Sequence, residues 1–325
     1  MKTFSIVVPV YFNETNLPDT IPQLLSLADE IPDYQLELVF VDDGSGDDSL
    51  KILRKFQMEY SNSIKVVKLT RNFGSMAAIQ AGFTVASGDC VGMISADLQD
   101  PPEKFLEMLS YWEKGSKAVF AIRQDREENF LQKFFAGTYY SLIRKFAIAN
   151  YPTSGFDFFL LDRQVIMELN KVQEKNTNIM TLAFWLGFQP VMLPYIRRQR
   201  VKGKSRWTLS KKIKLFVDTF VAFSFFPIRL LSILGLLVAA GSFLYGAFVL
   251  FYWFVYGIEV KGWVPTIVVL TFTSGLQMAM LGVLGEYLWR TLDEIRRRPQ
   301  FVIDEIYPAP DSPKPDPVSD NPEVR

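Results

Sequence analysis

The sequence predicts an α/β domain with a mostly parallel sheet, followed by two membrane-spanning helices. Three observations support this fold class: short apolar runs that alternate with helical stretches, polar residues after most of these runs, and two long uncharged stretches near the C-terminus. Apolar runs without polar alternation are typical of strands that are buried on both faces. Strands that alternate with helices favour parallel pairing in a doubly wound sheet.

The order of the predicted elements places polar residues at one edge of the sheet. The strands are expected at Ile6–Val10, Leu38–Val41, Val66–Leu69, Val91–Ile94 and Ala118–Ile122, and the helices at Thr20–Glu30, Asp48–Tyr60, Ser75–Ala86 and Glu103–Lys114. Ligands of such sheets bind beyond the carboxyl ends of the strands. Acidic, amide or glycine residues follow the first four strands, namely Asn13 and Glu14, Asp42 and Asp43, Asn72 and Gly74, and Asp97 and Gln99. One such turn is ordinary, but four at one edge indicate a binding site.

The composition narrows the chemistry that this site can perform. The 325 residues include no histidine and one cysteine, which excludes histidine-based catalysis, an intramolecular disulfide and a four-cysteine zinc site. A metal ion would therefore need oxygen ligands, which favours Mg²⁺ or Mn²⁺. Lys and Arg total 35 and so do Asp and Glu, so the net charge indicates no polyanionic partner. We expect no nucleic-acid partner.

Two stretches without charged residues, Leu230–Gly257 and Gly262–Gly285, are long enough to cross a bilayer. Buried core helices are the alternative, but uncharged runs of this length are rare in soluble cores. Lysines and arginines flank the pair on its outer sides, so the positive-inside rule places both termini in the cytoplasm. Residues 208–227 put apolar side chains at helical spacing with lysines opposite, which predicts an amphipathic helix at the membrane surface. Residues 130–149 are a second candidate, for which packing on the α/β domain is equally open.

These features divide the chain into four parts. We expect a cytoplasmic α/β domain at 1–207, a juxtamembrane helix at 208–227, two spans within 228–290 (about 230–257 and 262–288), and a largely disordered cytoplasmic tail at 291–325. Glycines in both spans could pack against neighbouring helices, which leaves a homo-oligomer open.

A set of segments carries a family resemblance. IVVPVYFNE, VDDGSGDDS, RNFG, ADLQDPPE and GFDFFLLDR occur in this order, followed by a basic segment with the pattern Arg197-x-x-Arg200-x-x-Gly203-x-Ser205-Arg206. Together they resemble the family 2 glycosyltransferases of the polyprenyl-phosphate type, such as dolichyl-phosphate mannose synthases and GtrB-like bactoprenol glucosyltransferases. The resemblance covers about residues 4–210, and the two spans resemble the GtrB-like branch.

The resemblance implies a GT-A fold, a nucleotide-sugar donor, a divalent metal ion and a lipid-phosphate acceptor. It places the metal ion on Asp97 and Gln99. Members usually have Asp-x-Asp where this chain has Ser95-Ala96-Asp97, so one carboxylate is missing and Ser95 is not expected to be a direct ligand. It places Pro9, Tyr11 and Glu14 around the base and ribose of the donor, and Asp42 at the base edge with Asp43 beside it. We add Arg71 and Arg123 to these residues, which gives a predicted donor site of seven residues.

The expected chemistry needs little proton transfer. A divalent ion and a nearby arginine can offset the charge of a diphosphate leaving group. Arg123 follows the fifth strand and could reach it, although a solvated charged loop is equally open. A polyprenyl phosphate is already anionic near neutral pH and needs positioning more than deprotonation. Asp157 is the candidate carboxylate near the attacking group, with a helix or turn cap as the alternative, and the resemblance implies inversion at the anomeric carbon.

The basic segment, residues 197–206, is the candidate acceptor site. It carries six cationic side chains, Arg197, Arg198, Arg200, Lys202, Lys204 and Arg206. We predict that Arg197, Arg200, Ser205 and Arg206 bind the acceptor phosphate, and that Asp97, Asp157 and Arg200 form the catalytic set. A general basic patch for anionic lipid is the alternative.

The resulting hypothesis is transfer of one hexose, with glucose from UDP-glucose preferred, to undecaprenyl phosphate at a bacterial plasma (inner) membrane. The sequence does not distinguish glucose from mannose, galactose or aminoarabinose-type donors. A processive polysaccharide synthase is one alternative, although Gly203 stands where its Gln-x-x-Arg-Trp motif needs glutamine. A non-catalytic membrane anchor that binds nucleotide-sugar is the other, because Ser95 removes one carboxylate.

Overall fold

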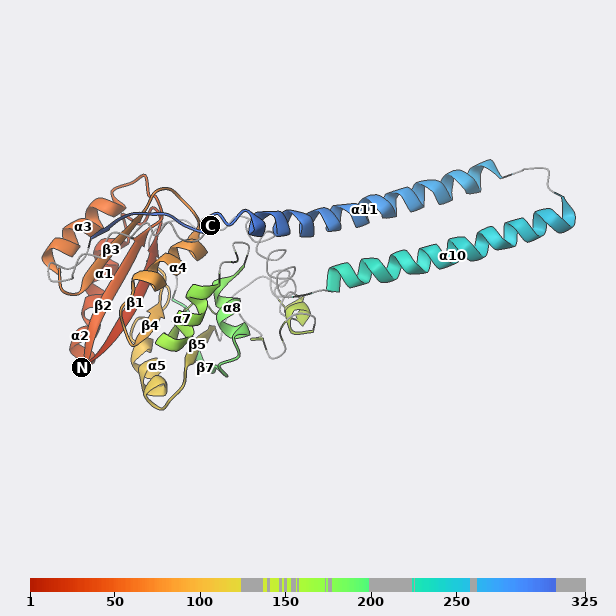
Figure 1. The fold of residues 1–325 in the computed structure, drawn as a ribbon. Helices are drawn as coiled ribbons and strands as arrows, with labels where there is room; N and C mark the ends of the chain where they lie inside the picture. The colour runs from red at the N-terminus through yellow and green to blue at the C-terminus, as the bar shows by residue number, and fades with distance from the viewer. Residues whose placement is uncertain are drawn as a thin grey trace, which may run out of the picture.

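A computed structural model describes residues 1–123, 137–138, 141–145, 148, 151–152, 156, 158–172, 174, 177–198, 224, 226–257 and 262–307. The chain forms an α/β domain and two long helices that extend away from it side by side (Figure 1). The elements of the domain are those that the alternating apolar pattern predicts, with further strands and helices after the fifth strand.

An eight-stranded sheet forms the centre of the domain, in the order β7-β5-β6-β4-β1-β2-β3-β8. β1 pairs in parallel with β2 and β4, β2 with β3, and β5 with β7, whereas β6 and β8 run antiparallel to their neighbours. All strands except β6 and β8 therefore end at the same edge of the sheet. The strands are β1 (Lys2–Val10), β2 (Tyr34–Asp42), β3 (Ile64–Leu69), β4 (Cys90–Met93), β5 (Ala118–Arg123), β6 (Phe158–Asp162), β7 (Val191–Tyr195) and β8 (Ile303–Tyr307).

The register between the central strands β1 and β2 determines which residues lie side by side where these strands end. β1 and β2 are aligned from Lys2 opposite Tyr34 to Val10 opposite Asp42. Most residues of both strands are buried, which explains why neither strand alternates between polar and apolar residues. Asp42 therefore lies level with the end of β1.

Helices cover both faces of the sheet and form two apolar cores. One face carries α1 (Leu17–Leu25), α2 (Leu27–Glu30), α3 (Ser49–Glu59) and α5 (Lys104–Glu113), and the other carries α4 (Ser75–Val85), α7 (Arg163–Lys171) and α8 (Ile179–Trp185). α4 lies close to the sheet at Gly82, where an added Cβ would come within 2.3 Å of Val7 Cγ1. Because α4 follows β3 in the chain, its N-terminus lies at the edge where the parallel strands end.

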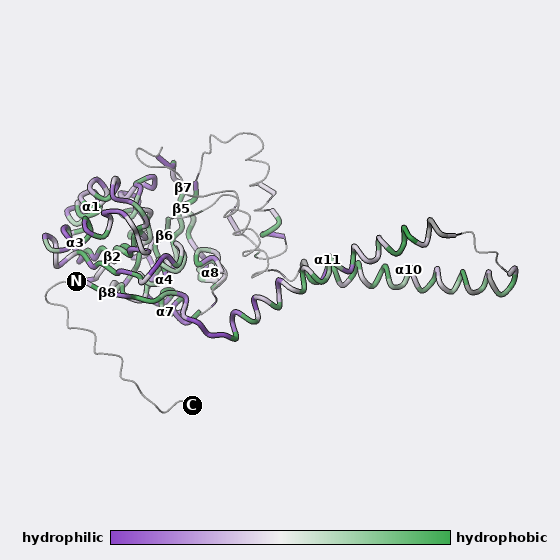
Figure 2. The backbone as a smooth tube through the Cα atoms, turned by 90° about the horizontal axis from the view of Figure 1, so that it is seen from above, coloured by the Kyte–Doolittle hydropathy of each residue, from purple (hydrophilic) through white to green (hydrophobic). Residues whose placement is uncertain are grey.

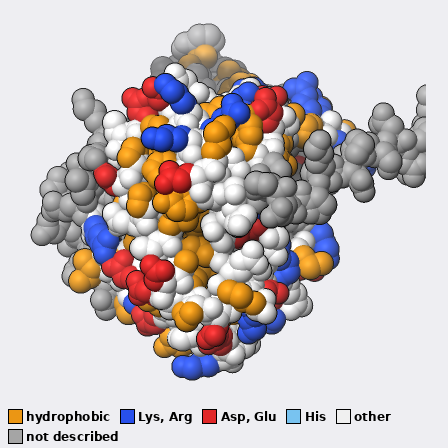
Figure 3. Space-filling model, turned by 90° about the vertical axis from the view of Figure 1, so that its left-hand side faces the viewer, with side chains coloured by type: hydrophobic (Ala, Val, Ile, Leu, Met, Phe, Trp, Pro, Cys, Tyr) orange, Lys and Arg blue, Asp and Glu red, His pale blue; other side chains and the backbone are white. Residues whose placement is uncertain are grey.

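The two long helices are α10 (Phe226–Tyr256) and α11 (Trp263–Ile295). Their segments Ile228–Tyr256 and Thr266–Ile295 are long and apolar enough to cross a membrane. Hydrophobic residues run along both helices in Figure 2, whereas the opposite end of the molecule carries interspersed acidic and basic side chains (Figure 3). Gly257, at φ +56°, ends α10 in the left-handed conformation that glycine accommodates.

Strand β8 differs from the predicted tail. Residues 291–325 were expected to be largely disordered, but α11 continues to Ile295 and β8 pairs antiparallel with β3. Lys68 on β3 forms ion pairs with Asp304 and Glu305, and the Arg54 guanidinium lies 4.5 Å from the centroid of the Tyr307 ring. Local sequence does not reveal such a strand because its partner Lys68 is 236 residues away from Asp304. Most of the predicted helix 208–227, and the tail beyond residue 307, lie outside the described residues.

β8 should contribute measurably to the stability of the α/β domain. A chain that ends at Arg298 loses the pairing with β3 and the packing of Phe301, Ile303 and Tyr307 on the two cores. We expect the free energy of unfolding to fall by at least about 2 kcal/mol, the order of one buried apolar side chain. Thermal melting of the detergent-solubilised protein should show a Tm lower by about 5 °C.

The matched control is a chain that ends at Tyr307, which retains β8. Its Tm should equal that of the full chain. Equal Tm values for the two truncated chains would show that β8 does not stabilise the domain.

Candidate functional site

The loops after β1 and β2 are joined by hydrogen bonds across the sheet edge. The Phe12 N–H donates to Ser45 Oγ at 3.0 Å, and the Asp48 N–H donates to Glu14 Oε2 at 3.0 Å. Phe12 has φ +56°, an uncommon conformation for a bulky residue. The loop after β1 is therefore held in one conformation by the start of α3, and Glu14 takes part in holding it.

The neighbouring carboxylates Asp42 and Asp43 are both buried but have different partners. Asp43 Oδ1 accepts from the Phe73 N–H at 2.7 Å, and its Oδ2 accepts from the Gly74 N–H at 2.9 Å. Asp42 Oδ2 accepts from the Ser45 N–H at 3.3 Å, whereas its buried Oδ1 has no hydrogen-bond partner among the described residues. Burial raises the pKa of both carboxyls. Asp43 thus fixes the loop before α4, and Asp42 keeps one acceptor oxygen for a ligand.

Gly44 allows the loops after β2 and β3 to meet. It has φ +69°, and an added Cβ would lie 2.7 Å from both Arg71 C and Asn72 N. The Arg71 guanidinium lies 4.0 Å from the centroid of the Phe73 ring. Six of the seven residues predicted around the donor nucleotide belong to these three strand ends, namely Pro9, Tyr11, Glu14, Asp42, Asp43 and Arg71.

The loop after β4, residues 95–100, contains the predicted metal ligands and is called the metal loop below. Ser95 Oγ lies 2.7 Å from Asp97 Oδ1 and 3.1 Å from Asp100 Oδ2, so its single O–H lies between two carboxylates and can donate to either. The Gln99 N–H also donates to Asp97 Oδ1, at 3.3 Å. Leu98 has φ +52°, a strained conformation that tends to occur at functional sites. These contacts give Asp97 a defined orientation.

The loop after β7 meets the metal loop. The Tyr195 hydroxyl donates to Asp100 Oδ1 at 2.6 Å, and the Arg123 Nε at the end of β5 donates to the same hydroxyl at 3.4 Å. Burial, reinforced by Asp100, raises the pKa of Tyr195, which therefore remains a donor. The Arg198 N–H donates to the Gln99 carbonyl at 2.8 Å. Arg123 is thus placed beside the metal loop rather than beside Asp42.

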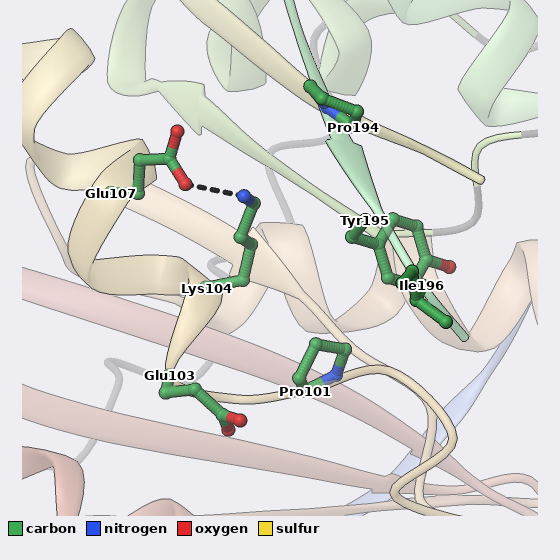
Figure 4. A pocket seen from close by; sticks show the side chains of 7 residues that line it. All are labelled: Pro101, Glu103, Lys104, Glu107, Pro194, Tyr195 and Ile196. Carbon is green, nitrogen blue, oxygen red and sulfur yellow. Dashed lines mark hydrogen bonds and ion pairs between the residues drawn. The ribbon is translucent and has the colours of Figure 1, made fainter. Parts of the chain in front are cut away.

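A cavity of about 420 Å³ lies next to this junction (Figure 4). Its walls come from the start of α5 and from β7, and Lys104 is paired with Glu107 inside it. Its lining residues are Pro101, Glu103, Lys104, Glu107, Pro194, Tyr195 and Ile196. Tyr195 is therefore shared between this cavity and the metal loop.

The metal loop fits a metal ion that takes most of its ligands from a substrate. Among the described residues, no three Asp, Glu or Cys side chains are grouped as a metal site. Asp97 and Gln99 lie on one short loop and are partly exposed, so they can offer a carboxylate and an amide oxygen. Mg²⁺ is commonly bound by one or two carboxylates together with phosphate oxygens. A carboxylate and an amide oxygen are a donor set that suits the predicted Mg²⁺ or Mn²⁺.

The remaining predicted residues, Asp157, Arg200, Ser205 and Arg206, lie outside the described residues. Arg197 is described, and its Nε lies 3.5 Å from Asp100 Oδ1. The sequence did not predict a role for Tyr195 or a structural role for Asp100, because their contact joins positions 95 residues apart and no local pattern marks it. The roles predicted for individual residues stay predictions.

The mostly parallel sheet with polar groups at its carboxyl edge defines an α/β protein with a ligand site at that edge. The chain matches Glycosyl transferase family 2 over residues 5–169 and belongs to that family. This membership, together with the sheet, confirms the predicted α/β fold of the GT-A type.

Relatives of this chain match it nearly end to end. The Uncharacterized glycosyltransferase YkcC of Bacillus subtilis (strain 168) is 37% identical over 94% of this chain and 94% of its own length. The SfII prophage-derived bactoprenol glucosyl transferase of Shigella flexneri is 34% identical over 92% and 96%. The Undecaprenyl-phosphate 4-deoxy-4-formamido-L-arabinose transferase of Shewanella sediminis (strain HAW-EB3) is 30% identical over 93% and 92%. These matches extend over the α/β domain and the two long helices.

Asp42→Asn and Asp43→Asn should have opposite effects on stability. The raised pKa of Asp42 means that the folded protein binds its proton more tightly than the unfolded chain does, so stability from this group is lost as the pH rises through the folded pKa. Asp42→Asn removes the buried charge and should leave Tm unchanged or raise it at pH 8, with a smaller gain at pH 5. Thermal melting at both pH values measures this.

Asp43→Asn is the paired variant, and it should lower Tm at both pH values. An amide nitrogen cannot accept from the Phe73 or Gly74 N–H, and an unsatisfied buried amide costs about 1–3 kcal/mol. A lower Tm for Asp42→Asn than for Asp43→Asn would contradict the assignment of their partners.

Proposed function

We propose that the protein transfers one hexose from a nucleotide-sugar donor to a polyprenyl phosphate at the membrane surface. The observation that carries the proposal is the end-to-end match to bactoprenol glucosyl transferases, which includes the two span-length helices as well as the α/β domain. UDP-glucose and undecaprenyl phosphate are the proposed substrates. The catalytic domain and both termini face the cytoplasm of a bacterial inner membrane, as the flanking basic residues favour.

The donor nucleotide binds at the ends of β1, β2 and β3. The unpartnered Oδ1 of Asp42 is an acceptor for an N–H group on the edge of a uracil ring, because a buried carboxylate oxygen without a partner is unfavourable. Tyr11 and Pro9 lie at the end of the adjacent strand and flank this position. Arg71, on the exposed part of the neighbouring loop, supplies positive charge toward the donor phosphates.

The donor diphosphate lies toward the metal loop. Asp97 and Gln99 would hold Mg²⁺ or Mn²⁺ there, and the bound ion would offset negative charge on the leaving diphosphate. Arg123 at the end of β5 adds a fixed positive charge beside this loop. Ser95 takes no place among the ligands but orients Asp97 through its hydroxyl.

The acceptor phosphate approaches from the basic segment. Arg197, Arg200, Ser205 and Arg206 bind its oxygens, and Asp157 and Arg200 act with Asp97 in the catalytic set. A phosphate oxygen attacks the anomeric carbon from the side opposite the leaving diphosphate, which inverts the configuration. The phosphate is already charged near neutral pH, so this step needs orientation of the acceptor more than a general base.

Relatives of similar identity are named for different sugars. One transfers 4-deoxy-4-formamido-L-arabinose and another transfers glucose. A panel of labelled UDP-, GDP- and arabinose-type donors, with purified protein, Mn²⁺ or Mg²⁺ and undecaprenyl phosphate, tests the proposal. We expect one labelled sugar per lipid, with the highest rate from UDP-glucose.

Two other outcomes of this assay would replace the proposal. Products that carry several sugars per lipid would favour a processive synthase. Binding of a donor without any labelled lipid would favour a non-catalytic anchor.

Asp97→Ala and Asp42→Asn should separate the two halves of the donor site. Asp97→Ala should abolish the increase in UDP affinity that Mn²⁺ produces and leave metal-free UDP binding near the wild-type value. Asp42→Asn should weaken UDP binding about tenfold or more with and without Mn²⁺, because a hydrogen bond to a charged group contributes about 1.5–3 kcal/mol. Calorimetric titration of UDP, with and without the metal, measures both, and unchanged Mn²⁺ dependence in Asp97→Ala would refute the metal assignment.

The acceptor assignment predicts a different kinetic change. Arg200→Ala should raise the KM for undecaprenyl phosphate and leave the Kd for UDP within about twofold of wild type, because a charge-assisted contact to the acceptor phosphate acts on the acceptor alone. Steady-state kinetics with varied lipid give the KM. An equal loss of donor and acceptor binding would move Arg200 to the donor site.

A further inference from the structure

We infer that Asp100 is a positioning residue that fixes the metal loop and the start of the basic segment in one mutual arrangement. This inference rests on the proposed function, because it concerns how the donor and acceptor sites are aligned. Asp100 is fully buried and is not itself a candidate ligand for the metal or the substrate.

Asp100 uses its two carboxylate oxygens on different loops. Oδ2 faces Ser95 Oγ at 3.1 Å, and the same hydroxyl lies 2.7 Å from Asp97 Oδ1. Oδ1 accepts from the Tyr195 hydroxyl at 2.6 Å and lies 3.5 Å from Arg197 Nε. One oxygen therefore acts on the candidate metal ligand through Ser95, and the other acts on the first arginine of the basic segment.

The pairing of strands does not align these two loops. β4 and β7 are separated in the sheet by β6 and β5, so no ladder hydrogen bond joins their ends. The loops are instead connected by Asp100 and by two hydrogen bonds between Gln99 and Arg198. The Arg198 N–H donates to the Gln99 carbonyl at 2.8 Å, and Gln99 Nε2 donates to the Arg198 carbonyl at 3.4 Å. The relative position of the metal loop and the basic segment thus depends on a small group of polar contacts.

The charge and burial of Asp100 fit a positioning role. A buried carboxylate is tolerated only with several partners, and replacing such a group by apolar residues often leaves stability unchanged. In contrast, removing a residue that orients a metal ligand without contacting the metal ion commonly changes the metal affinity. Arg197 Nε makes no hydrogen bond among the described residues. Its ion pair with Asp100 therefore orients the guanidinium without using all of its hydrogen-bond donors.

Three substitutions probe the two branches of this arrangement. Ser95→Ala removes the hydroxyl that connects Asp100 with Asp97. Tyr195→Phe removes the hydroxyl that contacts Asp100 and Arg123 and retains the ring that packs on Phe158. Asp100→Asn weakens both branches. We expect Ser95→Ala to raise the Kd of Mn²⁺ for the protein–UDP complex about tenfold, Tyr195→Phe to raise mainly the KM for undecaprenyl phosphate, and Asp100→Asn to raise both.

Asp162→Asn is the matched control. Asp162 is also a buried carboxylate, with hydrogen bonds from Trp112, Lys117 and the Gln164 N–H, but it pairs with Cys90 at the opposite end of β4. It should lower Tm and leave the Mn²⁺ Kd and the acceptor KM at wild-type values. If Asp100→Asn changes only Tm, as Asp162→Asn does, the positioning role is wrong.

The Mn²⁺ measurement, made by electron paramagnetic resonance with UDP and without acceptor, separates this inference from the proposed function. A wild-type protein that gives no labelled lipid with any donor would overturn the proposed function. The positioning role toward Asp97 would then still stand if Ser95→Ala and Asp100→Asn weaken Mn²⁺ binding. It fails if both variants bind Mn²⁺ as the wild type does. Should Asp100→Asn not fold, Ser95→Ala and Tyr195→Phe decide the outcome between them.

Discussion

The site depends on one constraint: carboxylates that are buried at the ends of parallel strands must find partners in the loops of other strands. Asp43 meets it with two backbone N–H groups of the loop before α4, and Asp100 meets it with the Tyr195 hydroxyl of β7, in addition to Ser95 of its own loop. Because an unpaired buried charge is so unfavourable, each carboxylate fixes the loop that satisfies it. Asp42 is the exception, with one oxygen left without a partner among the described residues, and this is why we propose it as the acceptor for a ligand N–H group.

Much of the α/β domain could be predicted from the sequence, and the parts that could not share a physical cause. The first five strands and the helices between them follow from buried apolar runs and local turn chemistry, and the predicted ranges overlap the observed elements. β6, β7 and β8 come after the regular alternation of strands and helices, and their places in the sheet depend on pairing with segments that are distant in the sequence. The same applies to Tyr195, whose hydroxyl gains its role only when β7 lies near the metal loop.

The sequence predicted which residues lie at the candidate site more completely than it predicted what each of them does. Six of the seven predicted donor residues come to neighbouring strand ends, because parallel strands end at one edge of the sheet. Within that group, Asp43 and Glu14 use carboxylate oxygens on backbone N–H groups, a structural duty that spacing alone does not reveal. Ser95, which first stands out as a missing carboxylate, lies between two carboxylates that would otherwise face each other without a donor between them.

The place of β8 bears on how the domain is held at a membrane. β7 and β8 form the two outer strands of the sheet, and the helical pair lies between them in the chain. The chain thus enters the helical pair from one outer strand of the sheet and returns from it to the other. Under the proposed membrane topology, the domain would be connected to its spans at two places, which restricts its rotation more than a single connection does.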